Sequence, residues 1–257
     1  MPATTTTLRA FVRSARTTGA MAAWALSLLL ACADAVAQDA AIRKAIAERL
    51  PKLPPIDEVN KSPVPGLWEV RYGGTEIFYS DDKGDFIIVN GALIDTKTRA
   101  DLTEARLEKL LAISFDKLPL KDAIVIKQGN GSRKLAVFGD PNCGYCKRFE
   151  RDLVAVKDVT IYTFVIPILG PDSTTKARDL WCAKDAAKSW RSWMIDGAVP
   201  TRPTGNCDSA AIDRNLAFAR AHRINGTPAV IFEDGTRKPG AIPLATVESL
   251  LLAAAKK

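Results

Sequence analysis

Two cysteines directly after a strand-like run constrain this chain more than any other feature. Residues 135–138 read Leu-Ala-Val-Phe and predict a strand, and a Gly-Asp-Pro-Asn turn separates them from Cys143-Gly144-Tyr145-Cys146. Residues three apart on a helix lie on the same face, so the two sulfurs can come within bonding distance. The C-G-Y-C motif therefore predicts thiol–disulfide chemistry at the junction of a strand and a helix.

The position of each cysteine in the helix predicts its role. Cys143 falls at the helix N-terminus, where unpaired backbone N–H groups and the positive end of the helix dipole favour a thiolate. The thiolate is the nucleophile in thiol–disulfide exchange, so we expect Cys143 to attack and Cys146, one turn deeper, to resolve the mixed disulfide. Gly144 and Tyr145 lie between the sulfurs, and we expect them to influence the reduction potential.

Three other interpretations of the cysteine pair are weaker. A zinc site needs two more ligands, but the chain has a single histidine, His222, and no second C-x-x-C. A papain-like protease motif fails at its third and fifth positions, and its base would have to be His222, which we expect to be solvated. A structural disulfide across so short a loop would remove little entropy from the unfolded chain. We therefore expect no metal and no cofactor beyond the cysteines themselves.

The N-terminus has the features of a secretory signal. Residues 1–37 begin with a basic region that contains three arginines, and residues 20–33 are almost continuously apolar. The apolar run is too short for a permanent transmembrane helix. Ala35-Val36-Ala37 supplies the small-x-small site that a signal peptidase cleaves, so we expect export and a mature chain that starts at Gln38.

An alternative processing site lies at Cys32. Leu29-Leu30-Ala31-Cys32 resembles a lipoprotein signal, in which Cys32 would be acylated and would hold the protein on a membrane. The A-x-A site, at a normal distance beyond the apolar run, favours cleavage after Ala37 instead. Either route places the remaining cysteines in an oxidising compartment, where disulfides persist.

Removal of the signal leaves four cysteines, and the second pair differs from the first. Cys182 and Cys207 enclose residues 183–206, and closing a loop of that length is worth roughly 3 kcal/mol in the chain-entropy model. We interpret this pair as a structural disulfide that closes an irregular insertion; redox exchange at the same pair is the alternative.

The charge of the chain argues against a nucleic-acid partner. The formal charge falls from +7 to +5 when the signal is removed, because the signal carries three Arg and one Asp. The remaining excess is spread along the chain without a block rich in Lys and Arg. This pattern indicates a solvated surface.

The first part of the mature chain predicts a short amphipathic helix and an antiparallel meander. Residues 41–50 carry apolar side chains at helical spacing, and prolines follow them. Between residues 59 and 94 the apolar pattern changes to a period of two, with Gly73-Gly74 and Asn90-Gly91 as hairpin turns. A small sheet with a free edge favours pairing with a second copy, so we expect dimerisation here. A sheet packed on its own catalytic domain is the alternative.

The rest of the chain alternates helices and strands. A D-x-x-E cap at Asp101 starts a connecting helix, and a hairpin formed by residues 124–126 and 135–138 leads to the C-G-Y-C motif. We expect the elements after the motif helix in this order: a strand at 160–166, an insertion without strands at 170–206, a helix at 208–222, a strand at 229–232 and a helix at 244–255. This order predicts an α/β layer with mixed strand pairing.

Thr227 and Pro228 stand directly before the strand at 229–232. A cis peptide bond at this proline would expose the preceding backbone for strand-like pairing with an extended peptide. An ordinary trans proline at a strand start is the commoner case. The two residues alone therefore leave the conformation of the bond open.

Together these features resemble the DsbC/DsbG family of periplasmic disulfide isomerases. The resemblance rests on C-G-Y-C within residues 135–149, on Leu-Trp-Cys-Ala-Lys at 180–184 and on Gly-Thr-Pro-Ala-Val within 225–232. It implies an α/β fold, α+β overall, with the following parts: a signal peptide at 1–37, a β-rich N-terminal dimerisation domain at 38–98, a linker helix at 99–116 and a thioredoxin-like catalytic domain with a helical insertion at 117–257.

The resemblance also implies roles and partners. Cys143 would attack and Cys146 resolve, Thr227-Pro228 would be the cis-proline loop that faces them, and Cys182–Cys207 would be structural. The protein would be a V-shaped homodimer that acts on misfolded, disulfide-containing exported proteins and is kept reduced by a membrane reductase of the DsbD type. A DsbG-like reductant of oxidised single cysteines and a holdase chaperone with secondary thiol activity are the alternatives.

Overall fold

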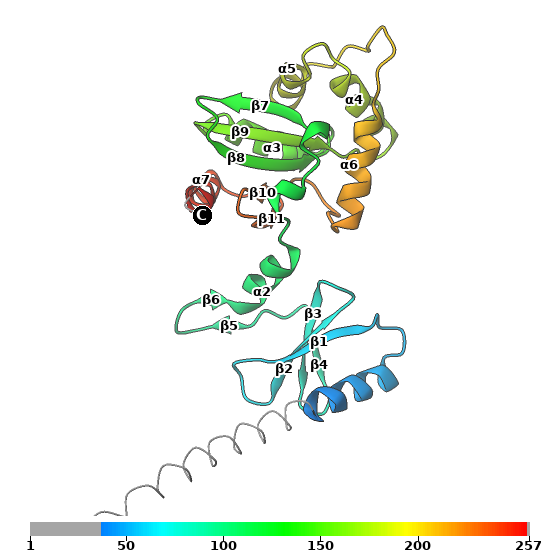
Figure 1. Cartoon of the computed structure of the whole chain (residues 1–257), viewed down its shortest axis with the longest axis vertical. Helices are drawn as coiled ribbons and strands as arrows, with labels where there is room; N and C mark the ends of the chain where they lie inside the picture. The colour runs from blue at the N-terminus through cyan, green and yellow to red at the C-terminus, as the bar shows by residue number, and fades with distance from the viewer. Residues whose placement is uncertain (1–36, 256–257) are drawn as a thin grey trace, which may run out of the picture. The chain divides into compact units, whose positions relative to one another are not determined.

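The structure is a computed structural model that describes residues 37–255 (Figure 1). The chain forms two compact units that divide after Thr103. Nearly all of the predicted signal, including Cys32, lies outside the described residues. Within residues 37–255, no helix combines the length and the apolar character that crossing a bilayer requires.

Among residues 37–103, a helix packs against a four-stranded antiparallel sheet. The helix covers residues 37–49, which confirms and extends the predicted amphipathic helix. The strands follow one another in the sheet in this order: β1 (Ile56–Lys61), β2 (Leu67–Tyr72), β3 (Glu76–Asp81) and β4 (Ile87–Val89). The core between helix and sheet consists of Ile42, Ile46, Trp68, Val70 and Phe78. The predicted turn at Gly73-Gly74 joins β2 to β3 and is confirmed.

Two details of this unit differ from the sequence prediction. The prediction omits β1, because polar and charged side chains interrupt its apolar pattern. The hairpin expected at Asn90-Gly91 is wrong. Asn90 does turn the chain, with a φ of 57°, but the chain then leaves the sheet, and β5 (Ile94–Asp95) pairs with β6 (Ala100–Asp101). As a result, β4 stands at an edge of the sheet formed by the described residues.

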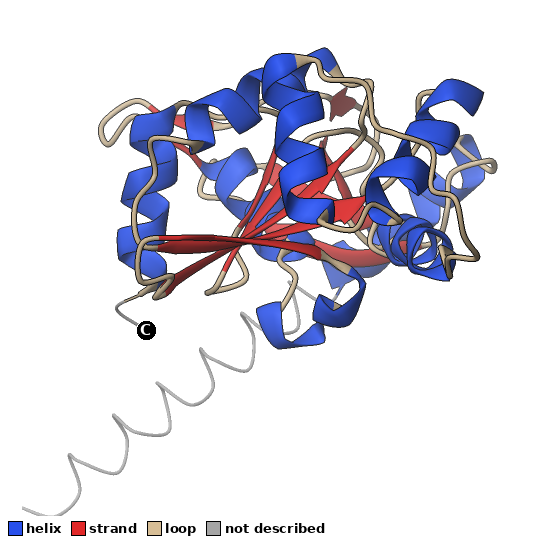
Figure 2. Ribbon diagram, turned by 90° about the horizontal axis from the view of Figure 1, so that it is seen from above, coloured by secondary structure: helices blue, strands red, loops and turns tan. Residues whose placement is uncertain are grey.

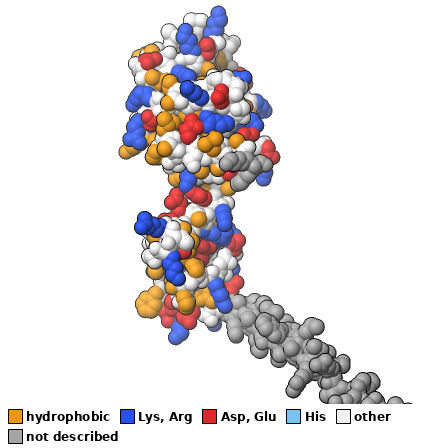
Figure 3. Space-filling view, turned by 90° about the vertical axis from the view of Figure 1, so that its left-hand side faces the viewer, with side chains coloured by type: hydrophobic (Ala, Val, Ile, Leu, Met, Phe, Trp, Pro, Cys, Tyr) orange, Lys and Arg blue, Asp and Glu red, His pale blue; other side chains and the backbone are white. Residues whose placement is uncertain are grey.

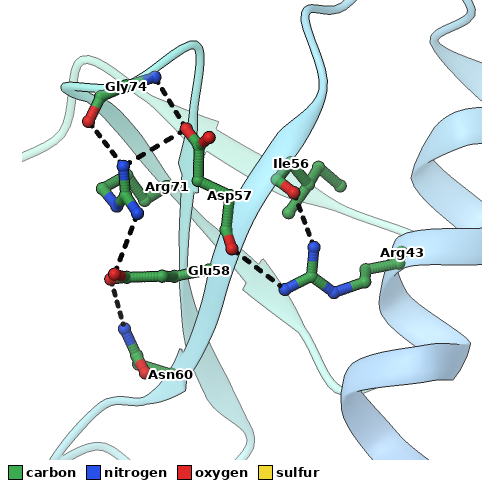
Figure 4. A network of polar contacts seen from close by, with 7 residues as sticks. All are labelled: Arg43, Ile56, Asp57, Glu58, Asn60, Arg71 and Gly74. Atoms are coloured by element: carbon green, nitrogen blue, oxygen red, sulfur yellow. Dashed lines mark hydrogen bonds and ion pairs between the residues drawn. The ribbon is translucent and has the colours of Figure 1, made fainter.

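Arg71 joins β1 to the turn that follows β2 (Figure 4). Its guanidinium donates to the Gly74 carbonyl at 2.6 Å and pairs with Glu58 at 2.8 Å and with Asp57 at 3.3 Å. The Asp57 carboxylate also accepts the Gly74 N–H at 2.6 Å. From the helix, Arg43 donates to a carbonyl of β1 at 2.6 Å. These polar contacts supplement a small apolar core.

Among residues 104–255, helices cover both faces of a five-stranded sheet (Figure 2). The strands are β7 (Ile124–Gln128), β8 (Arg133–Gly139), β9 (Val159–Val165), β10 (Ala229–Phe232) and β11 (Arg237–Pro239). The helices are α2 (Leu102–Leu111), which begins just before the division, α3 (Gly144–Leu153), α4 (Pro171–Trp181), α5 (Ala186–Arg191), α6 (Ala210–Ala221) and α7 (Leu244–Ala254). Single turns of 3-10 helix occur at Phe115–Lys117 and Leu120–Asp122, and a π-helical turn at Ser192–Asp196.

The five strands lie in the order β11-β10-β8-β9-β7. β8 and β9 are parallel and joined through α3, whereas the other neighbours are antiparallel, so the mixed pairing is confirmed. The predicted hairpin between β7 and β8 is wrong, because β9 lies between them. β8 is buried along most of its length and takes the centre of the sheet, whereas the alternation of buried and exposed residues in β7 suits an edge strand.

The alternating side chains of the central strands supply two cores. Leu135 and Val137 of β8 pack on one face with residues of α3, α5 and α7. Ala136 and Phe138 pack on the other face with α6 and with residues 113–118. Because successive residues of a strand point to opposite faces, β8 contributes to both cores and is fixed on both sides just before the C-G-Y-C motif.

The insertion between β9 and α6 is helical and closed by a disulfide. Cys182 ends α4, and Cys207 lies shortly before α6, with a Cα–Cα separation of 5.9 Å. The segment between them contains α5 and the π-helical turn, in agreement with the absence of a strand pattern.

Charged side chains of both signs cover the face of the molecule drawn in Figure 3. Lys and Arg alternate with Asp and Glu on this face, without a continuous block of one sign. Several pairs form ion contacts, for example Lys134 with Glu233 and Arg133 with Glu248. Charges of both signs are therefore interspersed on this face.

We expect Phe138→Ala to destabilise the unit formed by residues 104–255 by about 3–5 kcal/mol, the usual cost of removing a buried aromatic ring. Phe138 is fully buried, and its ring stacks on Phe164 at 4.6 Å and on Phe218 at 5.8 Å. Urea unfolding of the variant and the wild type measures the difference. A loss below about 1 kcal/mol would show that this core can collapse around the missing ring.

Candidate active site

The C-G-Y-C motif forms the first turn of α3, and Cys143 is the N-cap residue. The Cys143 sulfur accepts a hydrogen bond from the backbone N–H of Cys146 at 3.3 Å. A helix N-terminus leaves several N–H groups without backbone partners, so a sulfur at this position takes over the role of a capping oxygen. Negative charge on the Cys143 sulfur is stabilised by the same N–H and by the helix dipole.

The loop before β10 brings Thr227 and Pro228 to the motif. The peptide bond between them is cis, and the Cys143 thiol donates to the Thr227 carbonyl at 3.3 Å. This contact follows from the sheet order, because β10 is the neighbour of β8, with Ala229 opposite Phe138. The structure therefore places Thr227 and Pro228 beside Cys143, although 84 positions separate Thr227 from it in the chain.

The two sulfurs have different environments. Both cysteines carry free thiols, and Cys146 is the more deeply buried, with 2% of its surface exposed against 6% for Cys143. Burial raises the pKa of the Cys146 thiol strongly, and a hydrogen bond with Cys143 raises it further. Cys146 thus stays protonated at neutral pH and can donate its proton toward the Cys143 sulfur.

The other predicted site residues lie as follows. The Tyr145 side chain is 67% exposed next to the motif. Gly144 faces open space, since a Cβ placed on it would meet nothing within 4 Å. Cys182 and Cys207 form a disulfide with each other in the helical insertion. The structure thus groups Cys143 to Cys146 with the Thr227-Pro228 loop and keeps the second cysteine pair apart from them as a bonded unit.

Asp140 is a site residue that the sequence analysis does not single out. It lies in the turn before Cys143, and its carboxylate is completely buried. The carboxylate accepts backbone N–H bonds from Asn142, Ile168 and Leu169 at 2.7–2.9 Å and a bond from the Ser173 hydroxyl at 2.7 Å. Asp140 therefore fixes the active-site turn to the segment that follows β9.

Trp193, which lies in the helical insertion, forms a hydrogen bond with the same turn. Its indole N–H donates to the Pro141 carbonyl at 2.6 Å. The Lys147 ammonium lies 3.9 Å from the centre of a Trp193 ring, and that of Lys176 lies at 5.1 Å. Trp193 therefore contacts the active-site turn in addition to packing against the core of this unit.

Glu150 lies on the buried face of α3, one helical turn after Cys146. One carboxylate oxygen accepts the Trp190 indole N–H at 2.7 Å, and the other has no hydrogen-bond partner among the described residues. A Cβ placed on Gly139 would lie 3.5 Å from the Trp190 ring and 3.9 Å from the Cys146 sulfur, so these groups form one buried cluster. Burial raises the pKa of Glu150.

A sequence signal exists for Glu150 but not for the contacts of Asp140. The spacing of Cys146, Phe149, Glu150 and Leu153 defines one helix face, on which Glu150 is a charged residue among apolar ones. The partners of Asp140 come from a distant segment that only the folded sheet brings close. His222 is less solvated than expected: it is partly buried, its ring packs at a tilt against Phe218 with centroids 4.2 Å apart, and burial lowers its pKa.

Comparisons with known proteins agree with this site. A family model described as a thioredoxin-like domain matches residues 120–255, and one described as the N-terminal domain of disulfide bond isomerase protein matches residues 33–104. A probable thiol:disulfide interchange protein DsbC of Bordetella pertussis is 47% identical over 196 residues, which cover 76% of this chain and 68% of the relative.

The chain belongs to the DsbC family of thiol:disulfide interchange proteins. DsbC of Escherichia coli K12 is 28% identical over 213 residues, which cover 81% of this chain and 85% of the relative. A disulfide interchange protein from Neisseria gonorrhoeae superposes with a TM-score of 0.51 and 36% identity, over 55% of this chain and all of that structure. The resemblance inferred from the sequence and the thioredoxin-like fold are confirmed.

We expect Glu150→Gln to stabilise the protein increasingly as the pH rises from 5 to 8. Burial raises the pKa of Glu150 in the folded state, so the unfolded chain loses this proton at a lower pH, and the folded wild type loses stability as the pH rises through that interval. Gln keeps an acceptor for the Trp190 indole but cannot ionise. Urea unfolding of both proteins at the two pH values measures the effect. A difference that does not grow with pH would contradict it.

Proposed function

We propose that this DsbC-family protein is a periplasmic disulfide isomerase that rearranges wrong disulfides in exported proteins. The proposal rests on the different environments of the two sulfurs. Cys143 caps a helix and its thiol donates to the Thr227 carbonyl, whereas the Cys146 thiol is buried and its pKa is raised. A reactive sulfur with a protonated neighbour can form a mixed disulfide that persists long enough for a client thiol to attack it.

The proposed reaction is a series of thiolate exchanges. The Cys143 thiolate attacks one sulfur of a client disulfide, a Cys143–client disulfide forms, and the other client sulfur leaves as a thiolate. A second client thiolate then attacks the client sulfur and expels Cys143, which completes isomerisation without net oxidation. If Cys146 instead loses its proton and attacks Cys143, the client leaves reduced and Cys143–Cys146 becomes a disulfide. The reaction needs no cofactor other than the cysteine pair.

The backbone at Thr227 offers a place for the client chain. Its carbonyl accepts the Cys143 thiol in the resting form and loses that donor when Cys143 ionises. An extended client segment can then supply an N–H to the same carbonyl, in the manner of strand addition. This pairing would align the client disulfide with the Cys143 sulfur.

The first unit supports dimerisation through β4. Phe86, Ile87, Ile88 and Val89 are 77%, 38%, 53% and 51% exposed, and β4 is an edge strand among the described residues. An apolar edge strand is a template for pairing with another chain. We propose that a second copy covers this edge and forms the homodimer.

The remaining parts of the proposal rest on the sequence. The signal at residues 1–37 supports export to the periplasm, with cleavage after Ala37 favoured over acylation at Cys32. Isomerisation requires a reduced cysteine pair, so we propose a membrane reductase of the DsbD type as the electron donor. A DsbG-like reductant of sulfenic acids and a holdase chaperone are the competing functions.

We expect the double variant Cys143→Ala, Cys146→Ala to lose the reactivation of a scrambled multi-disulfide protein, down to the uncatalysed rate. A holdase needs no thiols, so full activity in this variant would refute the isomerase function. The single variant Cys146→Ala serves as the control: it should still attack and should accumulate a mixed disulfide at Cys143, detectable by mass spectrometry.

We expect Ile88→Asp to convert the dimer to a monomer in sedimentation equilibrium, because a charge at the paired edge opposes strand addition. Val125→Asp is the matched control, since Val125 is 47% exposed on the edge strand β7 of the other sheet. A dimer that survives Ile88→Asp, or that dissociates equally with Val125→Asp, would contradict pairing through β4.

A further inference from the structure

Both oxygens of the Asp140 carboxylate accept hydrogen bonds, and the donors come from two parts of the chain. One oxygen accepts the Asn142 N–H and the Ser173 hydroxyl, both at 2.7 Å. The other accepts the N–H groups of Ile168 at 2.7 Å and Leu169 at 2.9 Å. A buried carboxylate is costly unless its oxygens are paired, and here each oxygen accepts two donors.

The bonds to Asp140 coincide with an abrupt change in exposure. Val165, the last residue of β9, and Ile166 after it are fully buried, whereas Ile168 and Leu169 are 40% and 54% exposed. Because the carboxylate holds both backbone N–H groups of this pair, their position is fixed while the two apolar side chains face solvent. Two adjacent apolar side chains exposed on a fixed backbone form a small apolar surface that another molecule can cover.

The same residue orders the reactive sulfur. The Asp140 side chain accepts the Asn142 N–H, and its backbone carbonyl accepts the Cys143 N–H at 3.1 Å. Asp140 is therefore hydrogen-bonded both to the exposed pair, Ile168 and Leu169, and to the backbone of Cys143. A polypeptide that presents a disulfide to Cys143 is brought to this turn, next to the segment that carries the exposed pair.

We propose that Ile168 and Leu169 are specificity-determining residues that contact an apolar side chain next to the target disulfide of the client, and that Asp140 is the positioning residue that holds them. This inference rests on the proposed function and names the preferred client: a polypeptide segment with an apolar residue beside its disulfide cysteine.

The bonding pattern requires a carboxylate at position 140. Each carboxylate oxygen accepts at least one backbone N–H. In Asp140→Asn, one of the two positions becomes an NH2 group, which faces an N–H donor whichever way the amide is turned. The variant keeps the volume of the side chain and loses the attachment of one of the two segments.

The first test compares two peptides and a small disulfide. The peptides carry the same mixed disulfide with Leu or with Ser beside the cysteine, and oxidised glutathione is the third substrate. In the double variant Ile168→Ser, Leu169→Ser, we expect kcat/KM to fall about tenfold for the Leu peptide, mainly through KM, with no change for the Ser peptide or for glutathione. The control Val154→Ser, Leu252→Ser removes side chains of 51% and 57% exposure elsewhere and should leave all three rates unchanged.

The second test addresses Asp140. Asp140→Asn also loosens the turn that carries Cys143, so its readout is the ratio of kcat/KM for the Leu peptide to that for the Ser peptide. We expect this ratio to fall about tenfold, whereas Ser173→Ala, which leaves the three N–H bonds in place, should keep the wild-type ratio. Equal losses for both peptides in the double variant, or no loss at all, would overturn the inference. An Asp140→Asn variant that keeps the wild-type ratio of the two peptides would overturn the positioning role. A wild type inert toward every disulfide would instead refute the proposed function itself, and the inference with it.

Discussion

The hydrogen bond from the Cys146 N–H to the Cys143 sulfur is the contact on which the active site depends. It exists because Cys143 occupies the N-cap position of α3, where a sulfur can accept from the first turn. The same turn buries the Cys146 sulfur, whose pKa rises because burial disfavours its charged form. One local geometry thus gives the two sulfurs different environments, because Cys143 accepts a helix N–H whereas the Cys146 thiol is buried and protonated.

The surrounding fold fixes this geometry from several sides. β8 contributes alternate side chains to two cores and delivers the chain to the motif, while its neighbour β10 brings in Thr227. Asp140 joins the short turn between β8 and α3 to the segment after β9, and Trp193 joins the same turn to the helical insertion. The insertion is closed by the Cys182–Cys207 disulfide, so an oxidised pair stabilises the domain that presents a reduced one.

Local sequence patterns predicted most helices and strands of this fold, but they did not predict which strands pair over long sequence distances. The C-G-Y-C motif, the helix predicted at 41–50 and observed at 37–49, and the strand before Cys143 follow from composition and spacing. The prediction of a hairpin between β7 and β8 is wrong because proximity in sequence does not reveal that β9 is inserted between them. Asp140 escaped notice for the same reason, since its partners Ile168 and Leu169 become neighbours only once β8 and β9 are paired.

The central claim is that the fold makes only one of the two thiols reactive. Brief alkylation of the reduced protein with iodoacetamide at neutral pH, followed by mass spectrometric mapping, tests it directly. Iodoacetamide reacts with a thiolate, whereas the more deeply buried Cys146 thiol stays protonated. The account predicts that Cys143 is modified first and that Cys146 stays unmodified while the protein is folded. Modification of Cys146 at a rate equal to or above that of Cys143 would contradict it.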